Sequence, residues 1–156
     1  MNLDENGFPR EMPPTWFRFA LLAMLALHLF DGLSGPRILP APWHQAGIGL
    51  VLLGGGLILW AARLFQGAGT GIRPFRSLTR LVVHGPYRFT RNPMYLGMVL
   101  VLVGTAAWCR DLTPWFVVPV FVVVIDRRFI AREERFLADR LGDSYREYCQ
   151  RVRRWL

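Results

Sequence analysis

The sequence predicts an all-α integral membrane protein, a single domain over residues 1–156 with about four transmembrane helices followed by C-terminal amphipathic helices. Of the 156 residues, 53% are hydrophobic, yet the formal net charge is +8. Apolar and basic residues must therefore be separated along the chain, and uncharged blocks of nearly membrane length do alternate with charged segments. A soluble domain would instead show amphipathic periods throughout.

Two apolar blocks in the N-terminal half predict the first two spans. The polar opening segment ends in prolines, so a helix is expected to begin near Trp16 and to cover 16–33. After a break rich in glycine and proline, 43–62 runs without a charge for about 30 Å of helix. Trp43 and Trp60 lie near its two ends, as is typical of aromatic residues at membrane interfaces.

The segment 63–92 separates these blocks from two further apolar runs. It is rich in glycine, proline, arginine and serine, and a connection of that length in so small a protein is usually functional. The runs Pro93–Cys109 and 112–125 are each short for a span. We expect them to form a helix hairpin that turns near Arg110 and Asp111, accommodated by local thinning of the bilayer or by burial against neighbouring helices.

The charged tail from Asp126 onward predicts two short amphipathic helices that lie against the membrane or the bundle. Gly142 is expected to end the first helix, and Ser144 with Glu147 forms a capping-box pattern for the second. Apolar residues at helical spacing mark one face of each helix. They are Phe129, Ile130, Phe136, Leu137 and Leu141 in the first, and Tyr145, Tyr148, Cys149, Val152 and Trp155 in the second.

The placement of arginine predicts the orientation in the membrane. All 19 basic residues are arginine, and with four spans only Arg37 and Arg110 fall in the first and third connections, which leaves 17 on the opposite side or at its boundary. By the positive-inside rule, both termini and the segment 63–92 face the cytoplasm. The same rule accounts for the basic composition, so membrane lipids rather than nucleic acid are the expected partners.

Candidate functional residues concentrate in 81–97, where the cytoplasmic connection enters the third span. Pro93 is well placed to open that helix. Arg88 and Arg91 lie near the helix N-terminus, and together they create a positive field suited to a carboxylate or a phosphate. From the residues alone, anchoring of the helix by the positive-inside rule accounts for these arginines equally well.

A pair of carboxylates, Glu133 and Glu134, follows the fourth span. On a helix the two side chains point about 100° apart, so at most one is expected to face the bundle fully. A carboxylate at this place can pair with Arg91 or bind hydroxyl and ammonium groups of a ligand. The alternative is a solvated face with local ion pairs.

Other polar residues give weaker signals. The glycine-rich stretch 67–71 lacks the strand-turn-helix context of a dinucleotide site. The three histidines, His28, His44 and His84, do not have metal-ligand spacing, and the two cysteines do not cluster with them. No metal site is therefore predicted.

Four separated elements in the last half of the chain occur in a characteristic order. They are Gly85-Pro86-Tyr87; Arg91-Asn92-Pro93-Met94-Tyr95 with Gly97; Arg132 with Glu133 and Glu134; and the C-terminal set Leu141, Gly142, Tyr145, Tyr148 and Val152. In this order they resemble the isoprenylcysteine carboxyl methyltransferase and phospholipid methyltransferase superfamily. The set is more specific than any one of its motifs.

The resemblance implies a membrane-embedded enzyme that transfers a methyl group from S-adenosylmethionine to a lipophilic acceptor, with a cofactor-binding half over about 66–156. It implies catalytic roles for Arg91, Asn92, Tyr95 and Glu134. The residues that it implies around the cofactor are Gly69, Gly71, His84, Gly85, Tyr87, Arg91, Pro93, Tyr95, Glu133 and Glu134. Asn92 stands where the family usually has histidine, and an asparagine can still supply a hydrogen bond.

Two other functions match parts of the sequence. A non-catalytic membrane scaffold would account for the apolar blocks and the arginine bias, but not for the ordered motifs. A nicotinamide-dependent reductase of the related sterol-reductase fold would share the C-terminal architecture, but generally needs more spans. For a methyltransferase, an isoprenylcysteine carboxylate, a phospholipid amine and a small lipophilic thiol or acid are all open as acceptors, and so is the oligomeric state.

Overall fold

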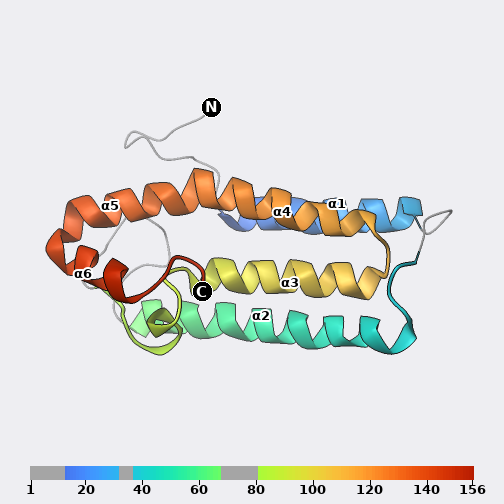
Figure 1. Cartoon of the computed structure of the whole chain (residues 1–156), viewed down its shortest axis with the longest axis horizontal. Coiled ribbons are helices and arrows are strands. Elements are labelled where there is room, and N and C mark those ends of the chain that lie inside the picture. The colour runs from blue at the N-terminus through green and yellow to red at the C-terminus, as the bar shows by residue number, and fades with distance from the viewer. Residues whose placement is uncertain (1–12, 32–36, 68–80) are drawn as a thin grey trace.

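Helices form almost all of the ordered framework (Figure 1). The computed structural model describes residues 13–31, 37–67 and 81–156, and within these ranges the extended pairing is limited to one antiparallel bridge between Arg37 and Asp111. In chain order, the elements are α1 (Pro13–Asp31), α2 (Ala41–Gly67), η1 (Gly85–Arg88), α3 (Pro93–Cys109), α4 (Thr113–Ile125), η2 (Asp126–Ile130), α5 (Ala131–Leu141) and α6 (Asp143–Arg151).

The apolar blocks of the sequence become the long helices of the bundle. Helices α1 and α2 are each long and apolar enough to cross a membrane, and α3 is a shorter apolar helix. Helix α1 begins at Pro13, earlier than expected, because proline is favoured in the first turn of a helix. Helix α2 extends beyond 43–62 at both ends, and α3 has the predicted bounds Pro93–Cys109.

The fourth apolar run continues past Ile125 instead of ending there. Helix α4 passes through η2, a single π-helical turn, into α5, so that the three elements form one continuous helix (Figure 1). The two predicted tail helices are present as α5 and α6, and the first of them follows α4 without a break. Charged residues begin at Asp126, but η2 contains neither glycine nor proline, and charge alone does not stop a helix.

Gly142 ends α5 as predicted, with a φ of 55° that glycine adopts at little cost. The predicted capping box is wrong. Helix α6 begins directly at Asp143, no side chain caps its N-terminus, and Ser144 already lies inside the helix. Glu147 pairs instead with Arg151, at 3.2 Å between Oε2 and Nη2.

Glycines allow α2 and α3 to approach closely along their length. A Cβ atom added to Gly54 would lie 2.5 Å from the carbonyl oxygen of Gly97, and one added to Gly97 would lie 2.7 Å from that of Gly54. Gly47 and Gly104 approach each other in the same way, nearer the start of α2 and the end of α3. Small residues that bring helix backbones together are characteristic of helix packing in membranes.

We expect Gly54→Ala to lower the melting temperature of the detergent-solubilised protein, because the added methyl group meets the backbone of α3. Overpacking of this kind costs about 1 to 3 kcal/mol. Gly49 also lies in α2, but a Cβ there would meet nothing within 4 Å. Gly49→Ala is therefore the matched control, and equal melting temperatures for the two variants would contradict the close packing.

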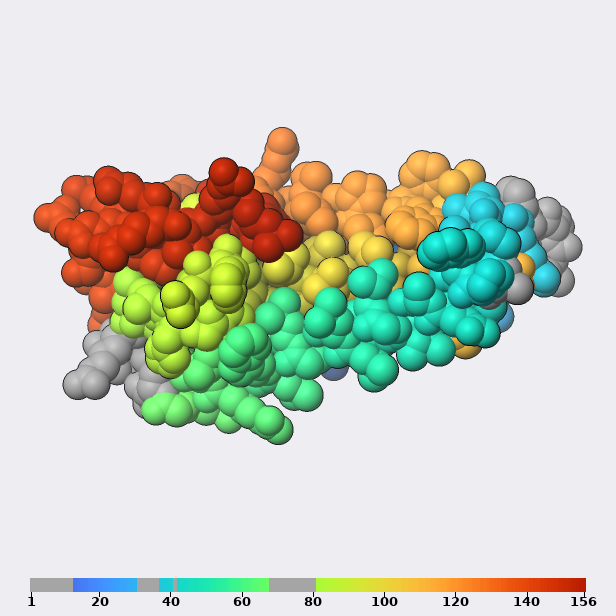
Figure 2. Space-filling model, turned by 60° about the horizontal axis from the view of Figure 1, so that its bottom comes forward, coloured from blue at the N-terminus to red at the C-terminus, as the bar shows by residue number. Residues whose placement is uncertain are grey.

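The polar segments gather at one end of this bundle. In Figure 2 the C-terminal residues lie beside the segment that follows residue 81, at the end of the molecule where α5 and α6 are found. Tyr145, Tyr148 and Val152 are buried together there, and Leu81 packs against them. This end carries the candidate site, whereas the rest of the bundle exposes large apolar side chains: Phe19, Leu25, Leu52, Leu53, Phe116 and Val120 are each more than half exposed.

Candidate functional site

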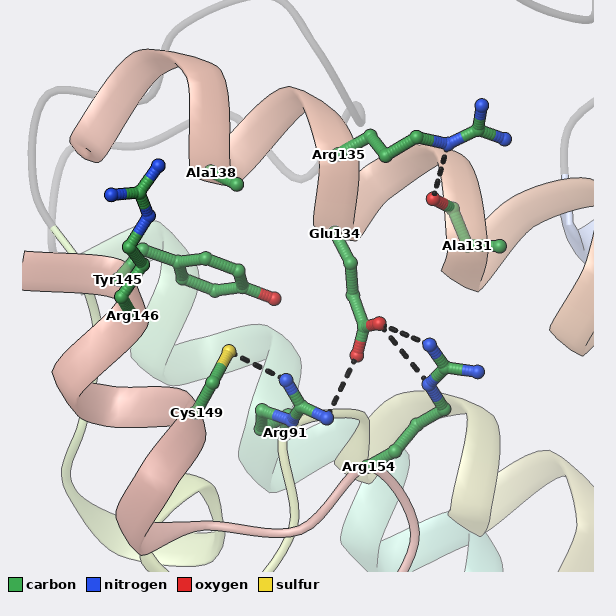
Figure 3. A pocket seen from close by; sticks show the side chains of 9 residues that line it. All are labelled: Arg91, Ala131, Glu134, Arg135, Ala138, Tyr145, Arg146, Cys149 and Arg154. Atoms are coloured by element: carbon green, nitrogen blue, oxygen red, sulfur yellow. Dashed lines mark hydrogen bonds and ion pairs between the residues drawn. The ribbon is translucent and has the colours of Figure 1, made fainter. Parts of the chain in front are cut away.

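An open pocket of about 630 Å³ lies where α5, α6 and the C-terminal residues meet the loop before α3. Three of its side chains, Arg91, Glu134 and Arg154, point toward one another in Figure 3. The full lining consists of Arg91, Ala131, Glu134, Arg135, Ala138, Tyr145, Arg146, Cys149 and Arg154.

Glu134 lies between two guanidinium groups. Its Oε1 atom is 3.3 Å from Nη2 of Arg91, and its Oε2 atom accepts hydrogen bonds from Nε of Arg154 at 3.1 Å and from Nη2 of the same residue. The side chains of Arg91 and Glu134 are each only 15% exposed. Ion pairs shielded in this way are stronger and less sensitive to salt than pairs on an open surface.

The C-terminal segment reaches the pocket because it docks on the loop before α3. The backbone N–H of Arg91 donates to the carbonyl of Arg153 at 3.0 Å. The hydroxyl of Thr90 and the side-chain amide of Asn92 both donate to the carbonyl of Arg154, at 3.0 and 3.1 Å. Asn92 is buried and does not line the pocket, so its amide holds the tail in place, and a catalytic role for it stays a prediction.

Tyr95 and Glu133 form a second polar contact outside the pocket lining. The hydroxyl of Tyr95 donates to Oε1 of Glu133 at 2.9 Å. Nearby, Tyr87 is buried, and its hydroxyl has no hydrogen-bond partner among the described residues. Glu133 turns to α3 while Glu134 turns to the pocket, in agreement with the expectation that at most one of the two carboxylates would face the bundle fully.

The burial of Glu133 affects its titration. Burial raises the pKa of this carboxyl to about 7, the hydrogen bond from Tyr95 opposes the rise, and the charge of Glu134 adds to it. Burial also raises the pKa of Tyr87 far above its ordinary value. The raised pKa brings the titration of the Glu133 carboxyl close to neutral pH.

This pKa predicts a pH-dependent stability. The unfolded chain releases the Glu133 proton near pH 4.5 and the folded protein near pH 7, so the folded state is progressively destabilised as the pH rises between these values. We expect Glu133→Gln to raise the melting temperature in detergent at pH 8 relative to the native protein, and to leave it unchanged at pH 4. Glu147→Gln, at an exposed position, is the control. If the melting temperatures of Glu133→Gln and the native protein changed in parallel with pH, the raised pKa of Glu133 would be contradicted.

The other predicted site residues are placed as follows. Pro93 opens α3 and is fully buried, and His84 is exposed just before η1. Gly85 has a φ of 63°, a backbone conformation that favours glycine, and a Cβ there would have to displace the end of the Leu64 side chain, whose Cδ1 would lie 2.6 Å away. Gly69 and Gly71 lie outside the described residues.

Sequence reasoning missed Arg154, which no motif distinguishes from the other arginines of the tail. It also did not anticipate that Arg91 would contact Cys149, although Nη1 of Arg91 donates to the Sγ atom of that residue. Both contacts depend on the docking of α6 and the C-terminal segment. In the part of the chain that the structure describes, no three His, Cys, Asp or Glu side chains gather as a metal site requires.

The chain is similar in sequence to known methyltransferases. The phospholipid methyltransferase family model matches residues 43–144. Protein-S-isoprenylcysteine O-methyltransferase A of Arabidopsis thaliana is 30% identical over 148 residues, which cover 87% of this chain and 71% of that protein. A probable protein-S-isoprenylcysteine O-methyltransferase of Oryza sativa subsp. indica is 31% identical over 137 residues, covering 80% and 67%.

The fold is similar to that of a solved membrane enzyme. The structure of the eukaryotic intramembrane Ras methyltransferase, isoprenylcysteine carboxyl methyltransferase, superposes with a TM-score of 0.73 at 22% identity. The match covers 90% of this chain and 51% of that protein, so this chain spans about half the length of the solved enzyme. At this identity the similarity concerns the fold.

Proposed function

Since the chain belongs to the phospholipid methyltransferase family and is an integral membrane methyltransferase, we propose that it transfers a methyl group from S-adenosylmethionine to a lipophilic acceptor. The proposed site of this transfer is the pocket that contains Arg91 and Glu134. The observation that carries the proposal is the cluster of Arg91, Glu134 and Arg154 in an open pocket at the polar end of an apolar bundle. A scaffold has no need of such a cluster.

The pocket matches the charged end of S-adenosylmethionine. Its volume of about 630 Å³ is within the usual range for cofactor sites. Among the described residues, Nε of Arg91 donates no hydrogen bond and Oε1 of Glu134 accepts none. A hydrogen-bond donor left over on a cation and a carboxylate oxygen held only by an ion pair at 3.3 Å, on residues that face each other, suit the α-carboxylate and the α-ammonium of an amino acid.

The chain's own residues would bind and align the reactants. When bound, S-adenosylmethionine supplies a methyl group on a sulfonium sulfur. Arg91 would hold the carboxylate and Glu134 the ammonium or hydroxyl groups, while Ala131, Ala138 and the ring of Tyr145 provide an apolar wall. Alignment of donor and acceptor can supply several kcal/mol of the barrier.

For the acceptor we favour an isoprenylcysteine carboxylate, delivered laterally from the lipid. The relatives with this activity in their names match 80% to 87% of the chain. A carboxylate is already a nucleophile at neutral pH, so it needs no base. The second candidate is a phospholipid amine, favoured by the description of the family.

The proposed topology has four spans with both termini and the pocket on the cytoplasmic side. The distribution of arginine supports this orientation. The continuous helix supports the fourth span, since the 13 residues of α4 with the 5 of η2 give about 27 Å at 1.5 Å per residue. Cysteine labelling in intact cells, at introduced positions 80 and 150, should show the same side for both, and opposite labelling would contradict four spans.

Transfer of a labelled methyl group tests the function. Purified protein is given labelled S-adenosylmethionine with either an S-farnesylated cysteine that has a free carboxylate or phosphatidylethanolamine. We expect label in the base-labile ester of the prenylcysteine. Label in the phospholipid alone would select the second candidate, and cofactor binding without label in any lipid would contradict both acceptors. Failure to bind S-adenosylmethionine would contradict the proposed chemistry.

A further inference from the structure

Arg154 joins two parts of the continuous helix to the pocket. Its Nε donates to Oε2 of Glu134 in α5, and its Nη1 lies 3.4 and 3.3 Å from the two carboxylate oxygens of Asp126 in η2. The neighbouring Trp155 donates from Nε1 to Oδ1 of Asp126 at 3.2 Å. The C-terminal segment is thus bound to both carboxylates through its side chains.

The backbone of Arg154 is fixed independently. Its carbonyl accepts hydrogen bonds from Thr90 and Asn92, which lie in the loop that also contains Arg91. One residue therefore spans the site from the loop before α3 to the helix that contains Glu134. Asp126 begins a π-helical turn, a feature often found at functional sites.

The contacts of Arg154 determine which oxygen of Glu134 is available. Arg154 occupies Oε2, whereas Oε1 lies beside Arg91 and accepts no hydrogen bond. If Oε2 were released, Arg91 and Glu134 could close on each other as a bidentate pair, the preferred geometry of guanidinium and carboxylate. That pair would consume both groups that a zwitterionic ligand needs.

We infer that Arg154 is a positioning residue of the pocket, which holds Glu134 by Oε2 so that Oε1 keeps only its single ion-pair contact with Nη2 of Arg91 and can turn, together with Nε of Arg91, to the amino-acid end of the cofactor. This inference rests on the proposed function. The side chain of Arg154 is 36% exposed, so it lies at the mouth of the pocket where a ligand can enter.

The test measures binding of S-adenosylmethionine to the purified full-length protein by calorimetry. We expect Arg154→Ala to weaken binding about ten- to a hundredfold, as for loss of charge-assisted hydrogen bonds. The KM for the cofactor should rise while the KM for the acceptor stays unchanged, a split that general destabilisation would not produce. Arg154→Lys keeps the charge but lacks the planar guanidinium, so its affinity for S-adenosylmethionine should lie between those of the native protein and Arg154→Ala.

Arg151→Ala is the matched control, because that arginine lies in the same tail but is 74% exposed and pairs only with Glu147 among the described residues. A native protein that binds no S-adenosylmethionine would overturn the proposed function itself. Native binding with unchanged affinity in Arg154→Lys and Arg154→Ala would overturn the positioning role alone. Tighter binding in Arg154→Ala would also overturn it, by showing that Arg154 competes with the ligand for Glu134.

Discussion

Replacement of Arg91 by alanine is expected to abolish nearly all methyl transfer, and replacement by lysine to impair it strongly, with normal membrane insertion in both variants. Arg91 is the pocket arginine whose Nε is unpaired and whose backbone anchors the C-terminal segment. Loss of two charge-assisted hydrogen bonds corresponds to about 3 kcal/mol or more, or over a hundredfold in kcat/KM. Lysine keeps the charge but cannot present two parallel donors to one carboxylate.

Labelled methyl transfer and membrane fractionation measure these outcomes together. The control is Arg63→Lys, at an exposed arginine near the end of α2 that only the positive-inside rule explains. If Arg91 served only as a topological anchor, lysine would substitute for it as well as it does at position 63. Full activity in Arg91→Lys would therefore remove Arg91 from the site.

The long helices were predictable because their signals are local. Apolar length, proline at the first turn and glycine at the end are all contained in the segment that they describe, which is why the bounds of α3 and the end of α5 at Gly142 were correct. The continuity of α4 with α5 was not predictable in this way. The change from apolar to charged residues marks the edge of a membrane rather than the end of a helix.

Packing between the helices was outside the reach of sequence reasoning. The close approach of Gly54 to Gly97 depends on the relative register of α2 and α3, and other glycines of α2 face open space. No sequence feature distinguishes the glycines of α2 that pack against α3 from those that face open space. Only the arrangement of the two helices distinguishes a glycine that packs from one that does not.

The candidate site was predictable to the extent that its residues belong to ordered motifs. The motif order pointed to Arg91 and Glu134, and the structure brings them within 3.3 Å across 43 positions of sequence. Arg154 belongs to no motif, and its contact with Glu134 depends on a tail that docks through Thr90 and Asn92. The different surroundings of the adjacent Glu133 and Glu134 likewise follow from tertiary contacts, which spacing alone cannot supply.

Those surroundings predict opposite effects for the same substitution at adjacent positions. Glu134→Gln removes the charge between Arg91 and Arg154 and leaves two guanidinium groups facing each other. Breaking a buried ion pair from one side costs about 3 to 5 kcal/mol, and the 15% exposure of Glu134 places the expected loss toward the lower value. We expect the melting temperature to drop accordingly, and the loss of a charge-assisted hydrogen bond to the cofactor, about 1.5 to 3 kcal/mol, to lower cofactor affinity about ten- to a hundredfold.

Glu133→Gln keeps an oxygen that can accept the hydrogen bond from Tyr95, and it removes a carboxylate whose ionisation is disfavoured by burial. At pH 8 it should therefore raise the melting temperature, with a much smaller change in affinity than Glu134→Gln. Calorimetric titration and thermal melts of the two variants in the same detergent measure both effects. Equal losses of affinity, or a lower melting temperature in both variants at pH 8, would show that the two carboxylates share one environment, contrary to the separate contacts with Tyr95 and Arg91.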